Sequence, residues 1–228
     1  MRKMISGLFL CVAGTVLSLT INHIVIETGV PLYMDTIFTV TVTFLAGPFW
    51  GSLTGALHNI VFQTIRFWGW EGYLFAICNI TTAWITWFFI RRFPAELSLH
   101  VAGNRLNKIM DRSIVLIIMA MVLCFIMSIL GGLISSIIIF MHTHKEGAAD
   151  IYASSGILSP SLLKRGVPLV LAEILSRIPV NIIDRLIAAF GGYGIALALR
   201  RFSFSHKSAI LYTGERYAGG TKGGTTKF

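Results

Sequence analysis

The chain has 228 residues, of which 55% are hydrophobic and 13% charged, and its mean hydropathy is +0.76. Soluble domains carry about 25% charged residues, so this composition excludes an ordinary soluble enzyme, a disordered chain and a disulfide scaffold. Nineteen Lys and Arg against ten Asp and Glu give a formal net charge of +9. In a chain this apolar we attribute the surplus to membrane topology, and we expect no nucleic-acid partner.

Six apolar segments are predicted to cross a membrane as helices. A spanning helix needs about 20 mostly apolar residues. In chain order the predicted helices cover residues 5–26, 32–46, 50–67, 73–90, 113–140 and 180–199. The first segment is longer than the core of a signal peptide and is followed by further spans, so we expect it to be retained.

The connections carry turn residues, basic residues or aromatic residues. The main ones are a turn at 27–31, Gly47-Pro48, an aromatic loop at 66–72, a basic linker at 91–112 and a polar loop at 141–161. Residues 162–178 form a short amphipathic stretch that Pro179 is expected to end or kink. We therefore predict an all-α integral membrane domain over residues 1–202 and a flexible, basic, Gly- and Thr-rich tail over 203–228.

The distribution of basic residues predicts the orientation. With the N-terminus in the cytoplasm, thirteen of the nineteen Lys and Arg fall in inner segments and four in outer ones. Basic residues accumulate on the cytoplasmic side of membranes. This asymmetry favours six helices with both termini inside, because a seventh would place the basic tail outside. Arg177 and Arg185, the two remaining basic residues, lie in or near the last helix.

Glycines recur every fourth residue at the start of the third predicted helix. Gly51 and Gly55 share one helix face, and Gly47 belongs to the tight connection before it. Small residues allow close backbone approach between membrane helices, so a well-packed helix pair is one interpretation. Asn59 and Gln63 lie on the same helix face at four-residue spacing and carry polar side chains. A functional role of this face is therefore the second interpretation.

The first predicted helix has a second face of small residues. Gly7, Cys11, Gly14 and Ser18 fall at helical intervals. This face suits either internal packing or docking against a partner helix, and the sequence does not separate these two interpretations.

Ionisable residues recur along the last helix and just before it. Glu173, Arg177, Asn181 and Arg185 follow one another at four-residue spacing, with Asp184 beside them. A charged side chain at a helix centre costs roughly 2.5–3.5 kcal/mol on insertion scales, so this stripe is not expected to face lipid. Either it forms a structural ion-pair network, with Glu173 paired to Arg177, or Asn181, Asp184 and Arg185 line a polar ligand pocket.

Further polar and aromatic residues are weaker candidates. Asn79 lies in the middle of a predicted helix and needs a partner. Trp68 and Trp70 fit an aromatic belt at the membrane surface and also the stacking of a planar ligand. Asp35 and the pair 22–23, Asn and His, lie near the outer ends of their helices.

Other chemistries lack their signatures. His142 and His144 have no third ligand nearby, so no metal site is expected. The three cysteines lie in apolar runs and are interpreted as small buried residues. The sequence contains no nucleotide-binding glycine loop with its Lys, no His-Glu-x-x-His and no Gly-x-Ser-x-Gly. We therefore predict a protein that is not an enzyme, hydrolyses no ATP itself and holds no cofactor.

Two stretches resemble one family. Residues 45–57, LAGPFWGSLTGAL, resemble the junction of helices 2 and 3 in the S components of energy-coupling factor (ECF) vitamin transporters. Residues 178–186, IPVNIIDRL, are similar to the start of their sixth helix, although many members have Lys where this chain has Asp184 and then Arg185. The Gly-Pro-x-x-Gly-x-x-x-Gly pattern is also similar to the membrane sensor domain of some bacterial histidine kinases.

The ECF resemblance implies a fold and a function over residues 1–202. It implies a pocket near the outer face, a first helix that docks on a transmembrane coupling subunit, and two ABC-type ATPases that supply the energy. We therefore expect the substrate-capturing subunit of an importer for a small, vitamin-like ring compound, in a bacterial-type plasma membrane. The alternative is a ligand-sensing or scaffold domain that does not transport. The expected substrate contacts are Asn79, Asn181, Asp184, Arg185, Trp68 and Trp70, and the expected docking residues are Gly7, Gly14 and Ser18.

Overall fold

The computed structural model describes residues 2–29, 32–66, 70–99, 105–142 and 158–203. These residues form helices and no strand. The elements are α1 (Arg2–Glu27), α2 (Ile37–Ala46), α3 (Pro48–Arg66), η1 (Trp70–Phe75), α4 (Ala76–Arg92), α5 (Arg105–His142), α7 (Leu158–Lys164) and α8 (Leu169–Ser203). The predicted tail, Trp68 and His144 lie outside the described residues, as does the side chain of His142.

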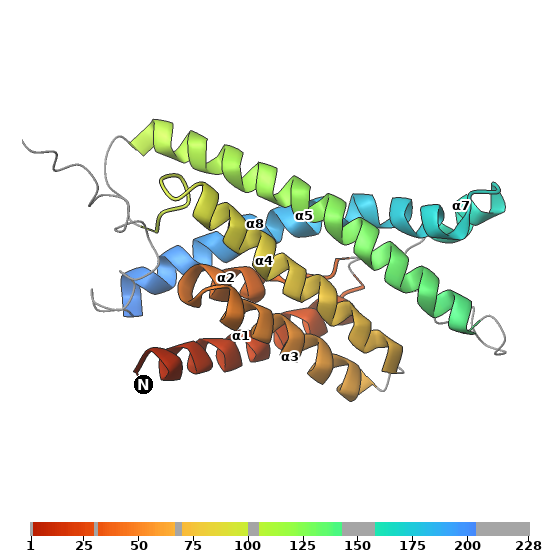
Figure 1. Ribbon diagram of the computed structural model, residues 1–228, viewed down its shortest axis with the longest axis horizontal. Helices are drawn as coiled ribbons and strands as arrows, with labels where there is room; N and C mark the ends of the chain where they lie inside the picture. Colours follow the sequence, from red (N-terminus) through yellow and green to blue (C-terminus); the bar gives the residue numbers. More distant parts are fainter. Residues whose placement is uncertain (1, 30–31, 67–69, 100–104, 143–157, 204–228) are drawn as a thin grey trace, which may run out of the picture.

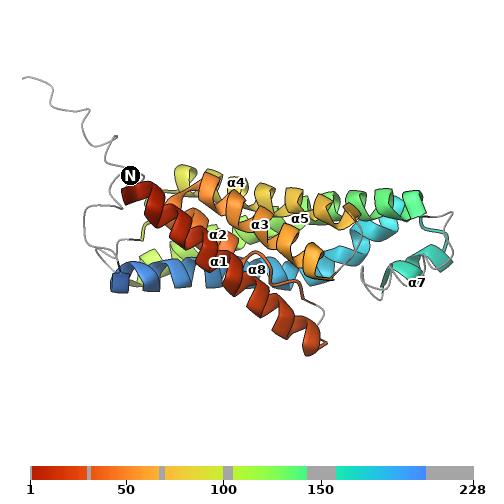
Figure 2. The same cartoon turned by 90° about the horizontal axis from the view of Figure 1, so that it is seen from below.

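The helices form an elongated bundle (Figure 1). The long helices α5 and α8 pack against each other, and α2 packs between α8, α3 and α4. The helix α1 crosses the bundle obliquely, against α2 and α3 (Figure 2). The start of α1 and the end of α8 lie at one end of the molecule, and α7 lies at the other end.

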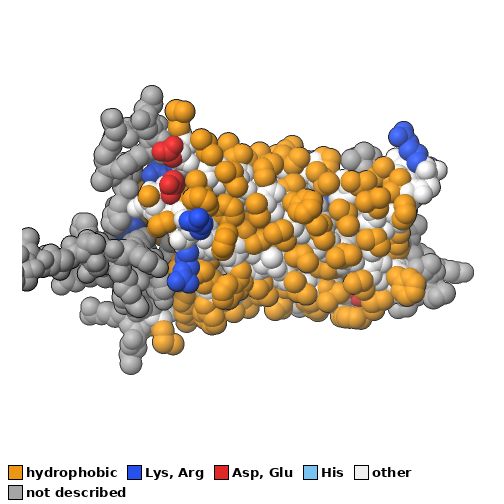
Figure 3. All heavy atoms as spheres, turned by 45° about the horizontal axis from the view of Figure 1, so that its top comes forward, with side chains coloured by type: hydrophobic (Ala, Val, Ile, Leu, Met, Phe, Trp, Pro, Cys, Tyr) orange, Lys and Arg blue, Asp and Glu red, His pale blue; other side chains and the backbone are white. Residues whose placement is uncertain are grey.

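The sides of the bundle are apolar. Large hydrophobic side chains such as Phe9, Phe125 and Ile183 are exposed on the long helices. Figure 3 shows an apolar surface across the middle of the face in view, with charged side chains towards the two ends. Among the described charges, Arg91 is exposed at the end of α4 and Lys164 at the end of α7. Such a surface suits contact with lipid rather than with water.

Four helical segments are long and apolar enough to cross a membrane. They are Met4–Glu27, Trp70–Arg92, Ile109–Met141 and Leu169–Arg200. The ten residues of α2 rise about 15 Å, against a hydrocarbon thickness of about 30 Å. The helix α3 is longer but carries polar residues that lower its hydropathy. The structure thus supports a multi-pass membrane protein, while α2 and α3 do not by themselves meet the criterion for spanning.

Small residues set the closest helix contacts. A Cβ at Gly132 of α5 would lie 2.9 Å from the backbone of Ile174, and one at Gly192 of α8 would lie 2.9 Å from the Ile37 carbonyl. These positions allow α5 and α2 to approach α8 directly. At the end of the bundle that holds the start of α1, a core around Met119, Leu123 and Tyr193 joins α5, α8 and α4.

Three predicted boundaries are wrong. The fifth helix begins at Arg105 instead of residue 113, inside the predicted basic linker. The second helix begins at Ile37 instead of residue 32, because residues 32–36 are held by side chains of α8, as described below. The stretch 162–178 is not a separate helix, because α8 begins at Leu169 and continues through Pro179 to Ser203. Pro179 lies on the exposed face of α8, away from the polar stripe, so the loss of its N–H leaves the buried face intact. The short helix before α8 is α7, which a turn at Gly166 separates from it.

Candidate functional site

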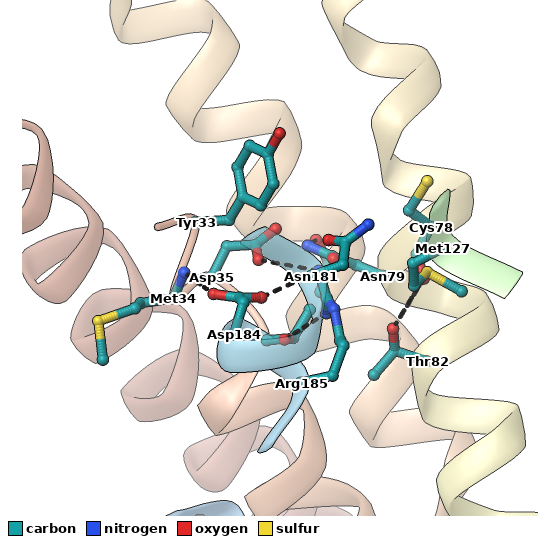
Figure 4. A network of polar contacts seen from close by, with 12 residues as sticks. Tyr33, Met34, Asp35, Cys78, Asn79, Thr82, Met127, Asn181, Asp184 and Arg185 are labelled. Carbon is teal, nitrogen blue, oxygen red and sulfur yellow. Dashed lines mark hydrogen bonds and ion pairs between the residues drawn. The ribbon is translucent and has the colours of Figure 1, made fainter. Parts of the chain in front are cut away.

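The candidate site is a set of buried polar residues on α8 and the elements that pack against it, here called the polar cluster. Four predicted site residues belong to it: Asn79 of α4, with Asn181, Asp184 and Arg185 of α8, each under 5% exposed. Figure 4 shows these four side chains gathered around Asp35. The structure therefore brings together residues that lie about a hundred positions apart in the sequence.

Asp184 and Arg185 hold the non-helical segment 32–36 in place. The Met34 N–H donates to Asp184 Oδ1 at 2.6 Å, and Arg185 Nη1 donates to Thr36 Oγ1 at 2.6 Å. The other Asp184 oxygen lies 3.2 Å from Arg185 Nη2, and Asp35 lies 3.9 Å from the same nitrogen (Figure 4). Asp184 thus satisfies a backbone N–H of this non-helical segment, and Arg185 holds a side-chain hydroxyl of the same segment. Irregular backbone at membrane depth needs such protein partners.

The two asparagines of the cluster have different partners. Asn181 Nδ2 donates to Ser128 Oγ of α5 at 2.9 Å. Asn79 Nδ2 donates to the Gly55 carbonyl at 3.4 Å, which supplies the partner that the sequence could not identify. Because Gly55 has no side chain, α3 approaches α4 closely at this point.

Arg177 lies one helical turn before Asn181 and is 7% exposed. Its guanidinium donates to the Tyr33 hydroxyl at 3.2 Å and to Ser135 Oγ at 2.5 Å, and it lies 5.5 Å from the centre of the Phe75 ring. No carboxylate among the described residues forms an ion pair with it. The predicted pair between Glu173 and Arg177 is therefore wrong.

The Glu173 side chain instead contacts α7. It is 1% exposed and accepts a hydrogen bond from Ser159 Oγ at 2.5 Å. Its second carboxylate oxygen, Oε2, is buried without a hydrogen-bond partner among the described residues. The contact between Ser159 and Glu173 joins the short α7 to the start of α8.

The glycine face of α3 is a packing surface that ends in buried polar groups. A Cβ at Gly51 would collide with Thr43 of α2, which confirms the interpretation as a tightly packed helix pair. Asn59 donates to the carbonyl of Gly55 in its own helix at 3.3 Å. Gln63 is buried too, with its side-chain amide against Gly72 of η1.

The small face of α1 also packs internally. A Cβ at Gly7 would overlap the Trp50 indole, and one at Gly14 would lie 3.1 Å from Thr54. Ser18 is fully buried. In this structure these three residues face α2 and α3 and are not on the surface.

Of the two aromatic candidates, only Trp70 lies among the described residues. It is part of η1 and is 60% exposed, unlike the buried members of the cluster. Of the other weak candidates, Asn22 is buried and donates to the Tyr33 carbonyl at 3.0 Å, while His23 is exposed.

Sequence reasoning missed the hydroxyl groups of the cluster, which come from residues 33, 36, 128, 135 and 159. Ser, Thr and Tyr are common in apolar helices and in loops, so residue type alone does not single them out. Ser128 and Ser135, seven residues apart on α5, give a weak signal, because this spacing places both on one helix face.

Several polar atoms of the cluster have no hydrogen-bond partner among the described residues. They are Asp35 Oδ1, Glu173 Oε2, Arg177 Nε, Asp184 Oδ2 and Arg185 Nε, although Asp35, Asp184 and Arg185 share ion pairs. Buried polar groups are normally hydrogen-bonded, so donors and acceptors remain for a small polar molecule. The described residues contain no group of three or more His, Cys, Asp or Glu that could hold a metal ion.

The fold and the cluster define a class: a helical membrane protein with charged and polar groups buried inside an apolar bundle. Comparisons of the chain with protein-family models, with curated proteins and with solved structures find no match.

Proposed function

We propose that this chain is the substrate-capturing subunit of an ATP-driven importer of the ECF type. Its substrate is a small, vitamin-like compound that it binds from the outer face. The observation that carries the proposal is the polar cluster, in which two arginines and two carboxylates are buried, beside the partly exposed Asp35, inside a bundle whose exterior is apolar. Ionisable residues within membrane helices are costly and mark substrate or ion sites. The motifs at residues 45–57 and 178–186 support the choice of this family.

The proposed orientation has six crossings and both termini in the cytoplasm of a bacterial-type cell. In this arrangement α2 crosses together with the segment 32–36. The side-chain amides of Asn79 and Asn181 contact the substrate, while Trp68 and Trp70 stand at the outer surface above it. The polar cluster then lies in the outer half of the bundle, and the thirteen inner basic residues face the cytoplasm.

The proposed partners are a transmembrane coupling subunit and two ABC-type ATPases. Because Gly7, Gly14 and Ser18 pack inside the bundle, docking through α1 has to use its exposed apolar face. That face includes Ile5, Phe9 and Val16. Otherwise α1 has to separate from α3 first.

Purification and uptake test this function together. A tagged chain, extracted from its native membranes in mild detergent, is expected to bring down a polytopic membrane protein and two nucleotide-binding subunits. Radiolabelled vitamins are expected to accumulate only in cells with those partners and with ATP. Accumulation in cells that lack every ATPase partner would overturn the proposal. Ligand binding without any ATP-dependent uptake would favour the sensing or scaffold alternative.

A further inference from the structure

The two buried arginines of α8 have different electrostatic surroundings. Arg185 has two carboxylates, Asp184 at 3.2 Å and Asp35 at 3.9 Å. Arg177 has only hydroxyl groups, those of Tyr33 and Ser135. Arg185 is therefore neutralised within the protein, and Arg177 has no ion-pair partner in the described part of the chain.

The burial of Arg177 makes this imbalance significant. The residue is only 7% exposed, so bulk water and lipid headgroups have little access to its charge. An isolated ion in a low-dielectric interior is strongly unfavourable unless an opposite charge joins it. Glu173, one turn away on the same helix, does not form an ion pair with Arg177, and its carboxylate accepts a hydrogen bond from Ser159 of α7.

The polar groups around Arg177 keep hydrogen-bonding capacity that the described residues do not use. The Nε–H of Arg177 has no acceptor among the described residues. The Tyr33 and Ser135 hydroxyls accept hydrogen bonds from the guanidinium, so their own protons are free to turn to an anionic oxygen. On the α5 side the guanidinium packs closely against Gly131, because a Cβ added there would lie only 3.3 Å from Arg177 Nη1. On another side the Phe75 ring offers an apolar, aromatic wall.

We propose that Arg177 binds a carboxylate group of the captured molecule, assisted by the hydroxyls of Tyr33 and Ser135. The planar guanidinium matches a carboxylate in a charge-assisted, bidentate manner. Arg177 offers a single positive charge, and the carboxylates of Glu173, Asp35 and Asp184 belong to the same cluster. This balance favours a monoanion over a phosphate dianion. Phe75 suits a ring or alkyl group next to the carboxylate. This inference rests on the proposed function and narrows its substrate class to carboxylic acids.

Matched acid and amide pairs test the proposal on the purified chain in detergent. The probes are nicotinate and nicotinamide, biotin and biotinamide, pantothenate and panthenol, and benzoate and benzamide. Thermal stability and equilibrium binding are measured for the wild type, for Arg177→Gln and Arg177→Lys, and for Arg165→Gln. Arg165 is exposed after α7 and serves as the control for the loss of one positive charge.

We expect at least one acid to stabilise the wild type and the Arg165→Gln variant, while its neutral analogue does not. Arg177→Gln is expected to weaken binding of that acid by on the order of tenfold to a hundredfold, and Arg177→Lys to retain part of it. Without ligand, Arg177→Gln is expected to melt at the same temperature as the wild type or higher, because it removes an uncompensated charge.

Three results would overturn the proposal. The first is that the wild type prefers no acid over its neutral analogue, and the second is that the preferred acid binds Arg177→Gln as well as it binds the wild type. The third is that Arg177→Gln melts well below the wild type without ligand. The last result would show that Arg177 is structural. The failure of this inference can be told apart from the failure of the proposed function. ATP-dependent uptake of a neutral compound would contradict the carboxylate inference and leave the proposed function standing.

Discussion

At the residue scale, Asp184 is the carboxylate that joins the segment 32–36 to α8. It is fully buried, accepts the Met34 N–H and pairs with Arg185. A buried ion pair contributes little compared with an apolar replacement of the same shape, but the loss of one partner leaves an unpaired charge. Asp184 is therefore expected to be a determinant of folding, whatever the substrate is.

Asp184→Asn is expected to lower the free energy of unfolding by about 3–5 kcal/mol, the usual cost of breaking a buried pair from one side. Asp35→Asn is expected to cost less, because its carboxylate lies at 3.9 Å and is partly exposed. Thermal denaturation in one detergent measures both. A smaller loss for Asp184→Asn than for Asp35→Asn would contradict this ranking. The double variant Asp184→Asn, Arg185→Gln is expected to recover part of the loss, since only the partly exposed Asp35 carboxylate then lacks its ion pair.

The sequence could predict the charged members of the cluster but not their pairing. Asn181, Asp184 and Arg185 stand out because ionisable and amide groups are rare in apolar helices. Arg177 and Glu173 were expected to pair, since they are one turn apart on one helix. The structure separates them, because Ser135 of α5 and Ser159 of α7 offer closer partners. These hydrogen-bond partners depend on how α5 and α7 pack against α8, and the spacing of residues along α8 does not predict that packing.

At the element scale, α7 is attached to α8 through one buried hydrogen bond. Ser159 of α7 donates to Glu173, whereas Ser161 of the same helix is exposed. Removing the donor leaves a buried carboxylate oxygen unsatisfied, at a cost of about 1–3 kcal/mol.

Ser159→Ala is therefore expected to loosen α7, and Ser161→Ala is its control. Amide hydrogen exchange of the peptide covering residues 158–164 should speed up in the first variant and stay unchanged in the second. Equal exchange in both variants would show that the Ser159 hydroxyl does not anchor α7.

The contact between α2 and α8 can be tested with two glycines of the same helix. A Cβ at Gly192 would lie 2.6 Å from Val40 Cγ1, and one at Gly194 would meet nothing within 4 Å. Gly192→Ala is expected to destabilise the protein by about 1–3 kcal/mol through overpacking. Gly194→Ala is expected to be neutral or slightly stabilising. Chemical denaturation measures both, and equal effects would contradict the packing of α2 on α8.

Helix existence was predictable and helix boundaries were not. Apolar length identified the helices that became α1, α4, α5 and α8, because burial of long apolar runs needs little tertiary information. The start of α2 depends on Asp184, about 150 positions away, which binds the Met34 N–H. The continuity of α8 through Pro179 depends on packing against α5, which outweighs the local preference for a break.

At the scale of the whole molecule, the face shown in Figure 3 is apolar across its middle and has exposed charged side chains towards the two ends, whereas the polar cluster is inside the bundle. The start of α1 and the end of α8 share one end (Figure 1). The proposed six crossings would place both termini in the cytoplasm, the orientation that the distribution of basic residues predicts.

Reporter fusions test this orientation. A fluorescent protein fused after residue 228 is expected to fold in the cytoplasm and fluoresce, and alkaline phosphatase inserted near residue 150 is expected to be active outside. The reverse fusions are the controls and should be inactive. Phosphatase activity at the C-terminus would contradict the six-crossing arrangement.

The central claim is that the polar cluster holds a small molecule, and mass spectrometry of released compounds tests it most directly. The chain is purified from cells grown in rich medium, in parallel with Asn181→Ala and with the exposed-site control Arg165→Gln, and each is denatured to release bound compounds. We predict one small organic compound at near-stoichiometric amount from the wild type and the control, and much less from Asn181→Ala. Equal amounts from all three, or no compound from the wild type, would contradict the claim.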